Sequence, residues 1–383
     1  MRGHHKAFLG SLILIVAFVA IGCASVDSGK KDLKVSAFWV QDTLANENHQ
    51  FRKVNRMTPV IYKNSIVVGN ALDGLVSFDL AGKNQNWRLN IPRGVEASGA
   101  SIRDTLFVGG LNGKMYSVNL PDGHVNWTFD TKTEVVSEPL LEEGILYFMA
   151  GSQSVYSVDG VSGRQLWSYS RQDTSNNMTV RGGSKPALVN GVLYIGFSDG
   201  ALVALNSQTG TEQWEITLNR NTKFKDIDSS PVVSDDVLLI NSYDDKLYCI
   251  SKNKGEIVWS APYGGASTPL VMDDKVYTSS SRGELVALNK KDGSLIWKKD
   301  TKRGIFTDPI SFKNLLVTGE SQGRLMFVDK ENGSTMGSFE PGRGVFSKPA
   351  IYDNKVYFIS GEANAYGISA DFLTRPEIPY LRY

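Results

Sequence analysis

The sequence predicts an all-β fold, an eight-bladed β-propeller whose blades are four-stranded antiparallel sheets. The first observation is a repeated strand in which a turn glycine is followed four residues later by tryptophan. From Trp87 onward, successive tryptophans lie 38 to 47 residues apart, which is the period of a propeller blade and not of a helical repeat. The second is a proline or small residue that opens an apolar strand eight times: Pro59, Ala100, Pro139, Pro186, Pro231, Pro269, Pro309 and Pro349.

The clearest copy of the repeat is Gly200–Trp214. Its first half alternates side chains as a strand does, turn residues follow at Asn206–Gly210, and Trp214 lies in a second strand. Strands of the Leu-x-Ala-Leu type recur eight times along the chain: Leu75–Phe78, Met115–Val118, Val155–Val158, Leu202–Leu205, Leu247–Ile250, Leu285–Leu288, Leu325–Val328 and Ala365–Ile368. Each repeat therefore supplies one four-stranded blade.

The last repeat, Pro349 to Ile368, has no glycine–tryptophan strand after it. Trp39, near the other end of the chain, lies in a strand of the fourth type that is not preceded by the first three strands of a blade. Pairing this N-terminal strand with the last blade would close the ring and remove the two raw sheet edges. We therefore assign residues 37–371 to the propeller and 372–383, which contain Pro376 and Pro379, to an extended tail.

Residues 1–22 form a basic start and an apolar run, as in a secretory signal peptide. The run is short for a bilayer span of roughly twenty residues. Ala20-Ile21-Gly22-Cys23 resembles the bacterial lipobox, which implies that Cys23 is the lipidated first residue of the mature protein. The two residues after the cysteine, Ala24 and Ser25, are not aspartate, so the resemblance implies the periplasmic face of the outer membrane. Residues 23–36 are predicted to be a flexible tether.

Composition excludes several functions. Lys plus Arg is 41 and Asp plus Glu is 40, and this net charge of +1 does not indicate a basic surface that binds nucleic acid. The two cysteines, Cys23 and Cys249, are not expected to form a disulfide, and Cys249 is expected to be a small buried residue in a strand. Outside the signal only His49 and His124 remain, so no metal site and no catalytic triad are predicted.

The Leu-Asn-x-x-x-Gly-x-x-x-Trp motif resembles the tryptophan-docking repeat of quinoprotein dehydrogenases, whose propellers bind pyrroloquinoline quinone. An indole in every blade is better explained by packing of one blade on the next, with the ring nitrogen bonded to a carbonyl. The sequence has no adjacent cysteine pair. We predict no cofactor and no enzymatic activity. A quinoprotein oxidoreductase and a propeller that binds a small ligand in its channel stay open as alternatives.

Two neighbouring interblade connections are long, Ser168–Lys185 and Glu215–Ser230. From the docking tryptophan to the next opening residue they measure 19 and 17 residues, against 10 to 13 for the other connections between complete repeats. Equivalent loops of successive blades emerge on one face, so these two should lie side by side and form a composite surface.

Val180-Arg181-Gly182-Gly183-Ser184-Lys185-Pro186 and the segment Asp226–Val233 resemble the BamB family, propeller lipoproteins of the outer-membrane β-barrel assembly machinery. The resemblance extends over essentially the whole chain. It implies a non-enzymatic scaffold that binds the periplasmic domains of the insertase BamA. Unfolded outer-membrane proteins would be a second class of partner, captured at exposed strand edges. Matched by position, the residues that contact BamA are Met178, Val180, Arg181, Asp226 and Asp228.

The residues give this assignment a physical basis. Asp226 and Asp228 are two apart in an extended segment and would point the same way, so they can hold Arg181 through charge-assisted hydrogen bonds. A fixed guanidinium would then present its donors to a partner. The alternative is an ion pair between the two loops that only stabilises them.

Overall fold

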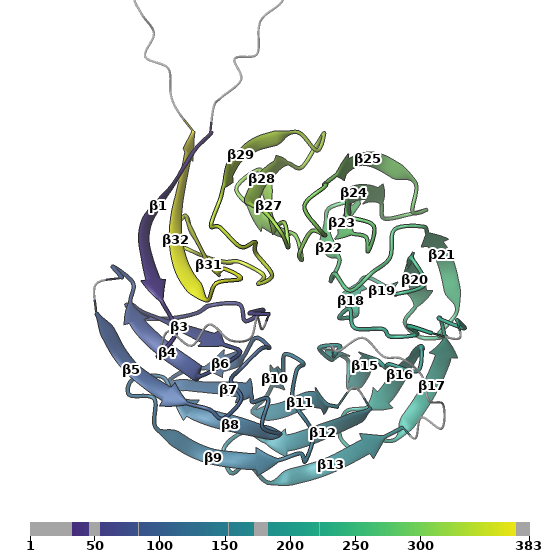
Figure 1. Ribbon diagram of the computed structural model, residues 1–383. Helices are drawn as coiled ribbons and strands as arrows, with labels where there is room; N and C mark the ends of the chain where they lie inside the picture. Colours follow the sequence, from purple (N-terminus) through teal and green to yellow (C-terminus); the bar gives the residue numbers. More distant parts are fainter. Residues whose placement is uncertain are drawn as a thin grey trace, which may run out of the picture. The chain divides into compact units, whose positions relative to one another are not determined.

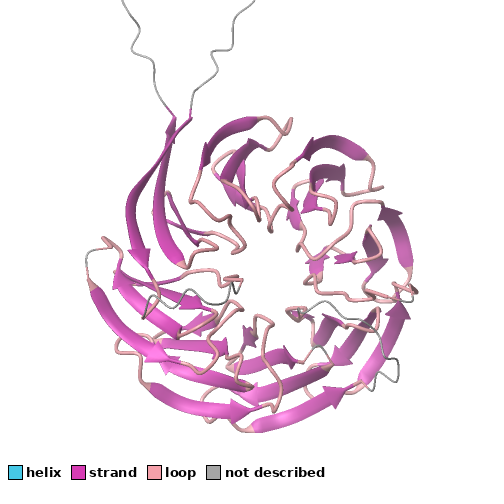
Figure 2. Ribbon diagram, viewed as in Figure 1, coloured by secondary structure: helices cyan, strands magenta, loops and turns pink. Residues whose placement is uncertain are grey.

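The computed structural model describes residues 33–45, 54–82, 84–151, 153–171, 183–221 and 223–372. These residues form 32 strands in eight four-stranded sheets, arranged as blades around a central axis (Figure 1). Within the described ranges there is no helix, and hence none that could cross a membrane (Figure 2). The predicted eight-bladed propeller is confirmed. The predicted signal peptide, Cys23 and residues 373–383 of the predicted tail lie outside the described residues.

Blades 1 to 7 each take four consecutive strands, and the chain runs outward from the axis in each. The innermost strands have three residues each: β2 (Val60–Tyr62), β6 (Ala100–Ile102), β10 (Leu140–Glu142), β14 (Ala187–Val189), β18 (Val232–Ser234), β22 (Leu270–Met272), β26 (Ile310–Phe312) and β30 (Ala350–Tyr352). The second strands are β3 (Ser65–Asn70), β7 (Thr105–Gly109), β11 (Ile145–Ala150), β15 (Val192–Gly196), β19 (Val237–Ser242), β23 (Lys275–Ser279), β27 (Leu315–Gly319) and β31 (Lys355–Ile359).

The third strands contain all eight of the predicted Leu-x-Ala-Leu segments: β4 (Gly74–Asp79), β8 (Lys114–Asn119), β12 (Ser154–Asp159), β16 (Ala201–Asn206), β20 (Lys246–Ser251), β24 (Glu284–Asn289), β28 (Leu325–Asp329) and β32 (Asn364–Phe372). The outermost strands are β5 (Gln85–Asn90), β9 (Val125–Asp130), β13 (Gln165–Ser170), β17 (Glu212–Thr217), β21 (Ile257–Ala261), β25 (Leu295–Asp300), β29 (Thr335–Phe339) and β1 (Leu33–Asp42).

The core lies between the blades. Each second strand is buried from its second residue on, because its sheet is covered on both faces by neighbouring blades; Ile66, Val67 and Val68 of β3 are all fully buried. Cys249 of β20 is also buried, as predicted, and burial raises the pKa of its thiol to about 11. Such a thiol stays protonated and is not a nucleophile.

The tryptophans join neighbouring blades, as predicted. The indole of Trp167 lies on the backbone of Gly210, in the turn of the next blade, where an added Cβ would come within 2.6 Å of the ring. Gly210 also has a φ of +72°, so both the turn and the close approach require glycine. Six indole nitrogens donate to a carbonyl of the next blade at 2.8 to 3.1 Å; the donors are Trp39, Trp87, Trp127, Trp167, Trp259 and Trp297.

The ring closes as predicted, with β1 as the fourth strand of the last blade beside β32. β1 begins at Leu33, so residues 33–36, assigned above to the tether, belong to this strand. A second boundary also moves. β6 begins at Ala100 and β2 begins just after Pro59, so Gly99, and not Ala100, holds the proline position of blade 2.

Candidate functional site

The connections from β13 to β14 and from β17 to β18 lie side by side where the structure describes them. The Ser184 hydroxyl donates to the carbonyl of Ser229 at 2.9 Å, and the backbone N–H of Lys185 donates to the Ser230 hydroxyl at 3.2 Å. The predicted juxtaposition of the two long loops is therefore correct for these residues. Direct hydrogen bonds between their ends fix the spacing of blades 4 and 5 near the axis.

The segment Asp226–Ser230 is held in an extended form along the inner rim. Ile227 is buried against Gly196 of β15, and its N–H donates to the carbonyl of Phe197 at 3.1 Å. The hydroxyl of Ser229 accepts from the N–H of Asn241 at 3.3 Å. Because Ile227 and Ser229 face the blades, the side chains of Asp228 and Ser230 line the central channel.

The two predicted aspartates have different surroundings. Asp226 is fully buried, whereas Asp228 lines the channel and keeps some exposure. Burial, followed by the nearby Asp226 carboxylate, raises the pKa of Asp228 to about 8, and the positive charge of Arg56 opposes this shift. A positive charge close to Asp228 would favour its ionised form against this repulsion.

The start of the first loop is anchored by a network of charges. Arg171, which is mostly buried, contacts Asp199 at 2.7 Å and Glu215 at 2.6 Å. Its guanidinium also lies over the ring of Phe197, 5.4 Å from the centroid. Asp199 and Phe197 lie between β15 and β16 and Glu215 lies in β17, so blade 4 fixes the point at which the loop leaves blade 3.

The predicted partner-binding residues are only partly placed. Met178, Val180 and Arg181 lie outside the described residues. Asp226 is inside the protein and Asp228 lines the channel, and the two carboxyl groups are near enough for their charges to interact. The exposed member of the pair is Asp228, and it faces the axis of the propeller.

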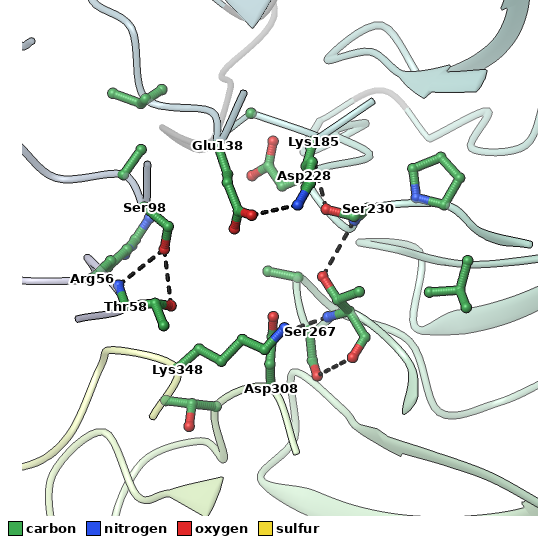
Figure 3. Close-up of a pocket in the computed structure, with 18 of the residues that line it drawn as sticks. Arg56, Thr58, Ser98, Glu138, Lys185, Asp228, Ser230, Ser267, Asp308 and Lys348 are labelled. Carbon is green, nitrogen blue, oxygen red and sulfur yellow. Dashed lines mark hydrogen bonds and ion pairs between the residues drawn. The ribbon is translucent and has the colours of Figure 1, made fainter. Parts of the chain in front are cut away.

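The axis itself holds a cavity of about 640 Å³ (Figure 3). All eight blades contribute to its wall through the residue that precedes the proline position: Thr58, Ser98, Glu138, Lys185, Ser230, Thr268, Asp308 and Lys348. The residues two positions earlier in the chain form a second layer, which includes Arg56, Glu96 and Asp228. Sequence reasoning missed this ring, although the residue before each blade-opening proline was a usable signal.

The channel has the size of a small-molecule site and mixed charge. It contains carboxylates, amines and hydroxyls, but within the described ranges no three His, Cys, Asp or Glu side chains gather closely enough to hold a metal ion. The wall can therefore offer hydrogen bonds and ion pairs to a solute.

The sequence model of the family described as "Outer membrane protein assembly factor BamB" matches residues 72–299 and 283–374. A relative of that name from Shewanella oneidensis is 27% identical over 230 residues, which is 55% of this chain and 57% of the relative. The chain thus matches little more than half of that relative's length.

Solved structures show the same fold. The crystal structure of BamB from Moraxella catarrhalis has a TM-score of 0.74 at 19% identity and covers 88% of this chain and 100% of its own. A quinohemoprotein alcohol dehydrogenase from Comamonas testosteroni has a TM-score of 0.71 at 13% identity, covering 90% of this chain and 78% of its own. At these identities the likeness concerns the fold alone. The family is shown by the sequence match, which extends over more than half of the chain. This chain belongs to the outer membrane protein assembly factor BamB family.

Proposed function

We propose that the protein is a non-enzymatic scaffold that helps β-barrel proteins to fold and insert into the outer membrane. In this proposal a lipid on Cys23 holds it at the periplasmic face, and it binds the periplasmic domains of BamA. The observation that carries the proposal is the family match, which includes both long interblade connections. The quinoprotein alternative has only the shared fold in its favour.

The proposed partner surface is formed by the two neighbouring connections, with Met178, Val180 and Arg181 in direct contact. The contacts at both ends of the first connection support this assignment, because Arg171 anchors its start and Ser184 ties its end to Ser229. Fixed ends reduce the conformational entropy that a connection loses when a partner binds. Asp226 acts from inside by holding the second connection, and Asp228 contributes a carboxylate at the rim.

Charge reversal at Arg181 tests the surface. Arg181→Glu should weaken binding to purified BamA periplasmic domains roughly 30-fold or more, the loss typical of an arginine at the centre of an interface. Arg164→Glu is the matched control, because Arg164 is exposed in the turn between β12 and β13, at the far end of β13 from the loop. Binding is measured by titration calorimetry, and folding by circular dichroism and thermal melting.

Unchanged binding in Arg181→Glu would contradict the assignment of the surface. Lower thermal stability together with intact binding would instead favour an ion pair that only stabilises the loops. Equal losses in Arg181→Glu and Arg164→Glu would point to a general electrostatic effect and not to a specific contact.

A further inference from the structure

The short side chains of the channel ring form hydrogen bonds within the protein itself. The backbone N–H of Thr58 donates to the Ser98 hydroxyl at 2.9 Å, and Lys185 and Thr268 donate in the same way to Ser230 and Asp308 at 3.2 and 2.9 Å. At these positions a side-chain oxygen from one blade caps the backbone of the preceding blade. These groups therefore stabilise the ring, and they explain why Ser, Thr or Asp occurs there.

Several of the charged groups in the channel are paired with each other. Arg56 contacts Glu96 at 3.4 Å, and the ammonium of Lys185 contacts Glu138. Asp228, just before blade 5, and Lys348, just before blade 8, differ from these pairs. Asp228 is attracted by the charge of Arg56 and Lys348 by that of Asp308, without a hydrogen bond or a close ion pair to a described residue. In Figure 3 Asp228 and Lys348 lie on opposite sides of the open centre.

The surroundings of both groups favour a charged ligand. Burial and the Asp226 charge keep the pKa of Asp228 high in spite of the attraction from Arg56, and an ammonium group against the Asp228 carboxylate would add a second stabilising charge. Lys348 is attracted by Asp308 and opposes the burial that raises the pKa of that carboxyl. One oxygen of Asp308 accepts from the backbone N–H of Thr268 at 2.9 Å, and Lys348, which also lines the channel, could exchange its attraction to Asp308 for a contact with a carboxylate that enters the channel.

We propose that the channel binds a small zwitterion of the size of a short peptide, with its ammonium at Asp228 and its carboxylate at Lys348. The cavity volume of about 640 Å³ accommodates such a molecule. Apolar wall residues such as Phe306 and Phe346 would contact its middle. This inference shares Asp228 with the proposed partner surface, whereas Lys348 belongs to the channel alone, so the Lys348 variant tests the inference separately from that surface.

Titration calorimetry of the full-length protein with trialanine tests the proposal. Saturable binding to one site is expected, and blocking either end of the probe, as N-acetyl-trialanine or trialanine amide, should weaken it about tenfold or more. Lys348→Met should weaken binding of trialanine to a similar extent and remove the preference for trialanine over its amide. Asp228→Asn should remove the preference over the N-acetyl form. Lys254→Met, at an exposed turn outside the channel, is the matched control and should bind like the wild type.

Absence of saturable binding up to about 20 mM trialanine would overturn the proposal. The dissociation constant would then lie above that concentration, which is weaker than a specific site of this kind provides. Equal affinity for trialanine, N-acetyl-trialanine and trialanine amide would overturn it as well. So would equal affinity in Lys348→Met and Lys254→Met, provided that both variants melt like the wild type.

Discussion

Seven blade junctions carry a docked indole, and the eighth, between blades 7 and 8, does not. Gly337 of β29 pairs with Phe327 of β28 in the position where Trp297 pairs with Ala287 one blade earlier. In the other junctions the indole lies on a turn glycine between the third and fourth strands of the next blade. Blade 8 has no such turn, because β32 and β1 come from opposite ends of the chain.

The difference shows how the closing strand replaces the indole. A Cβ on Gly337 would come within 2.7 Å of Val35, and Leu33 lies next to it, so β1 occupies the space that an indole fills elsewhere. The seam is then held by nine residue pairs between β1 and β32 and by apolar packing of β1 on β29. Loss of the tryptophan at this place is therefore a consequence of closing the ring there.

Removal of an indole from a regular junction should have the largest effect. Trp167→Ala should lower the free energy of unfolding by about 3–5 kcal/mol, because it leaves a cavity between blades 3 and 4 and an unpaired carbonyl at Ser207. The measurement is urea denaturation followed by circular dichroism. Leu166→Ala, a change at the exposed neighbour in the same strand, should cost far less. Equal losses in the two variants would contradict the docking role.

An indole added at the seam should have a smaller effect of a different kind. Gly337→Trp should lower the free energy of unfolding by about 1–3 kcal/mol through overpacking. It should also displace β1, so that hydrogen exchange speeds up at Lys34 to Ala37, which pair with β32, while β25 stays protected. Thr335→Trp, on the exposed part of the same strand, is the control. Unchanged protection of β1 would show that the seam tolerates an indole.

The fold of the repeating part of the molecule could be predicted because every blade uses the same kinds of residue for the same turns and packing contacts. Turn glycines, docked tryptophans and buried third strands recur at one period, so each copy supports the others, and even the closure follows from the unmatched Trp39. The first boundary of the propeller was set too late, at residue 37. Lys34 and Ser36 make the start of β1 polar, although the strand pairs along its whole length.

The channel could not be predicted in the same way, because its residues vary between blades. The position before the proline holds Lys185, Thr268 or Asp308, and no period identifies which of them is paired and which is free to bind. The two-residue spacing predicted that Asp226 and Asp228 point the same way and hold Arg181, and this stays a prediction. It could not show that Asp226 is buried, since that depends on how Ile227 packs against Gly196 of the neighbouring strand.

One regular junction differs in a detail that gives the smallest predicted effect. Trp214 makes no hydrogen bond through its ring nitrogen to a described residue; the carbonyl of Lys252, which takes the corresponding place, accepts from the Tyr194 hydroxyl at 3.2 Å. Trp167 does donate, to Ser207 at 2.8 Å. Trp167→Phe should therefore destabilise the protein by about 1 kcal/mol more than Trp214→Phe, since both lose similar packing and only one loses a hydrogen bond. Urea denaturation of the two variants in parallel measures the difference. A larger loss for Trp214→Phe would mean that the indole hydrogen bonds contribute little and that packing alone holds the blades together.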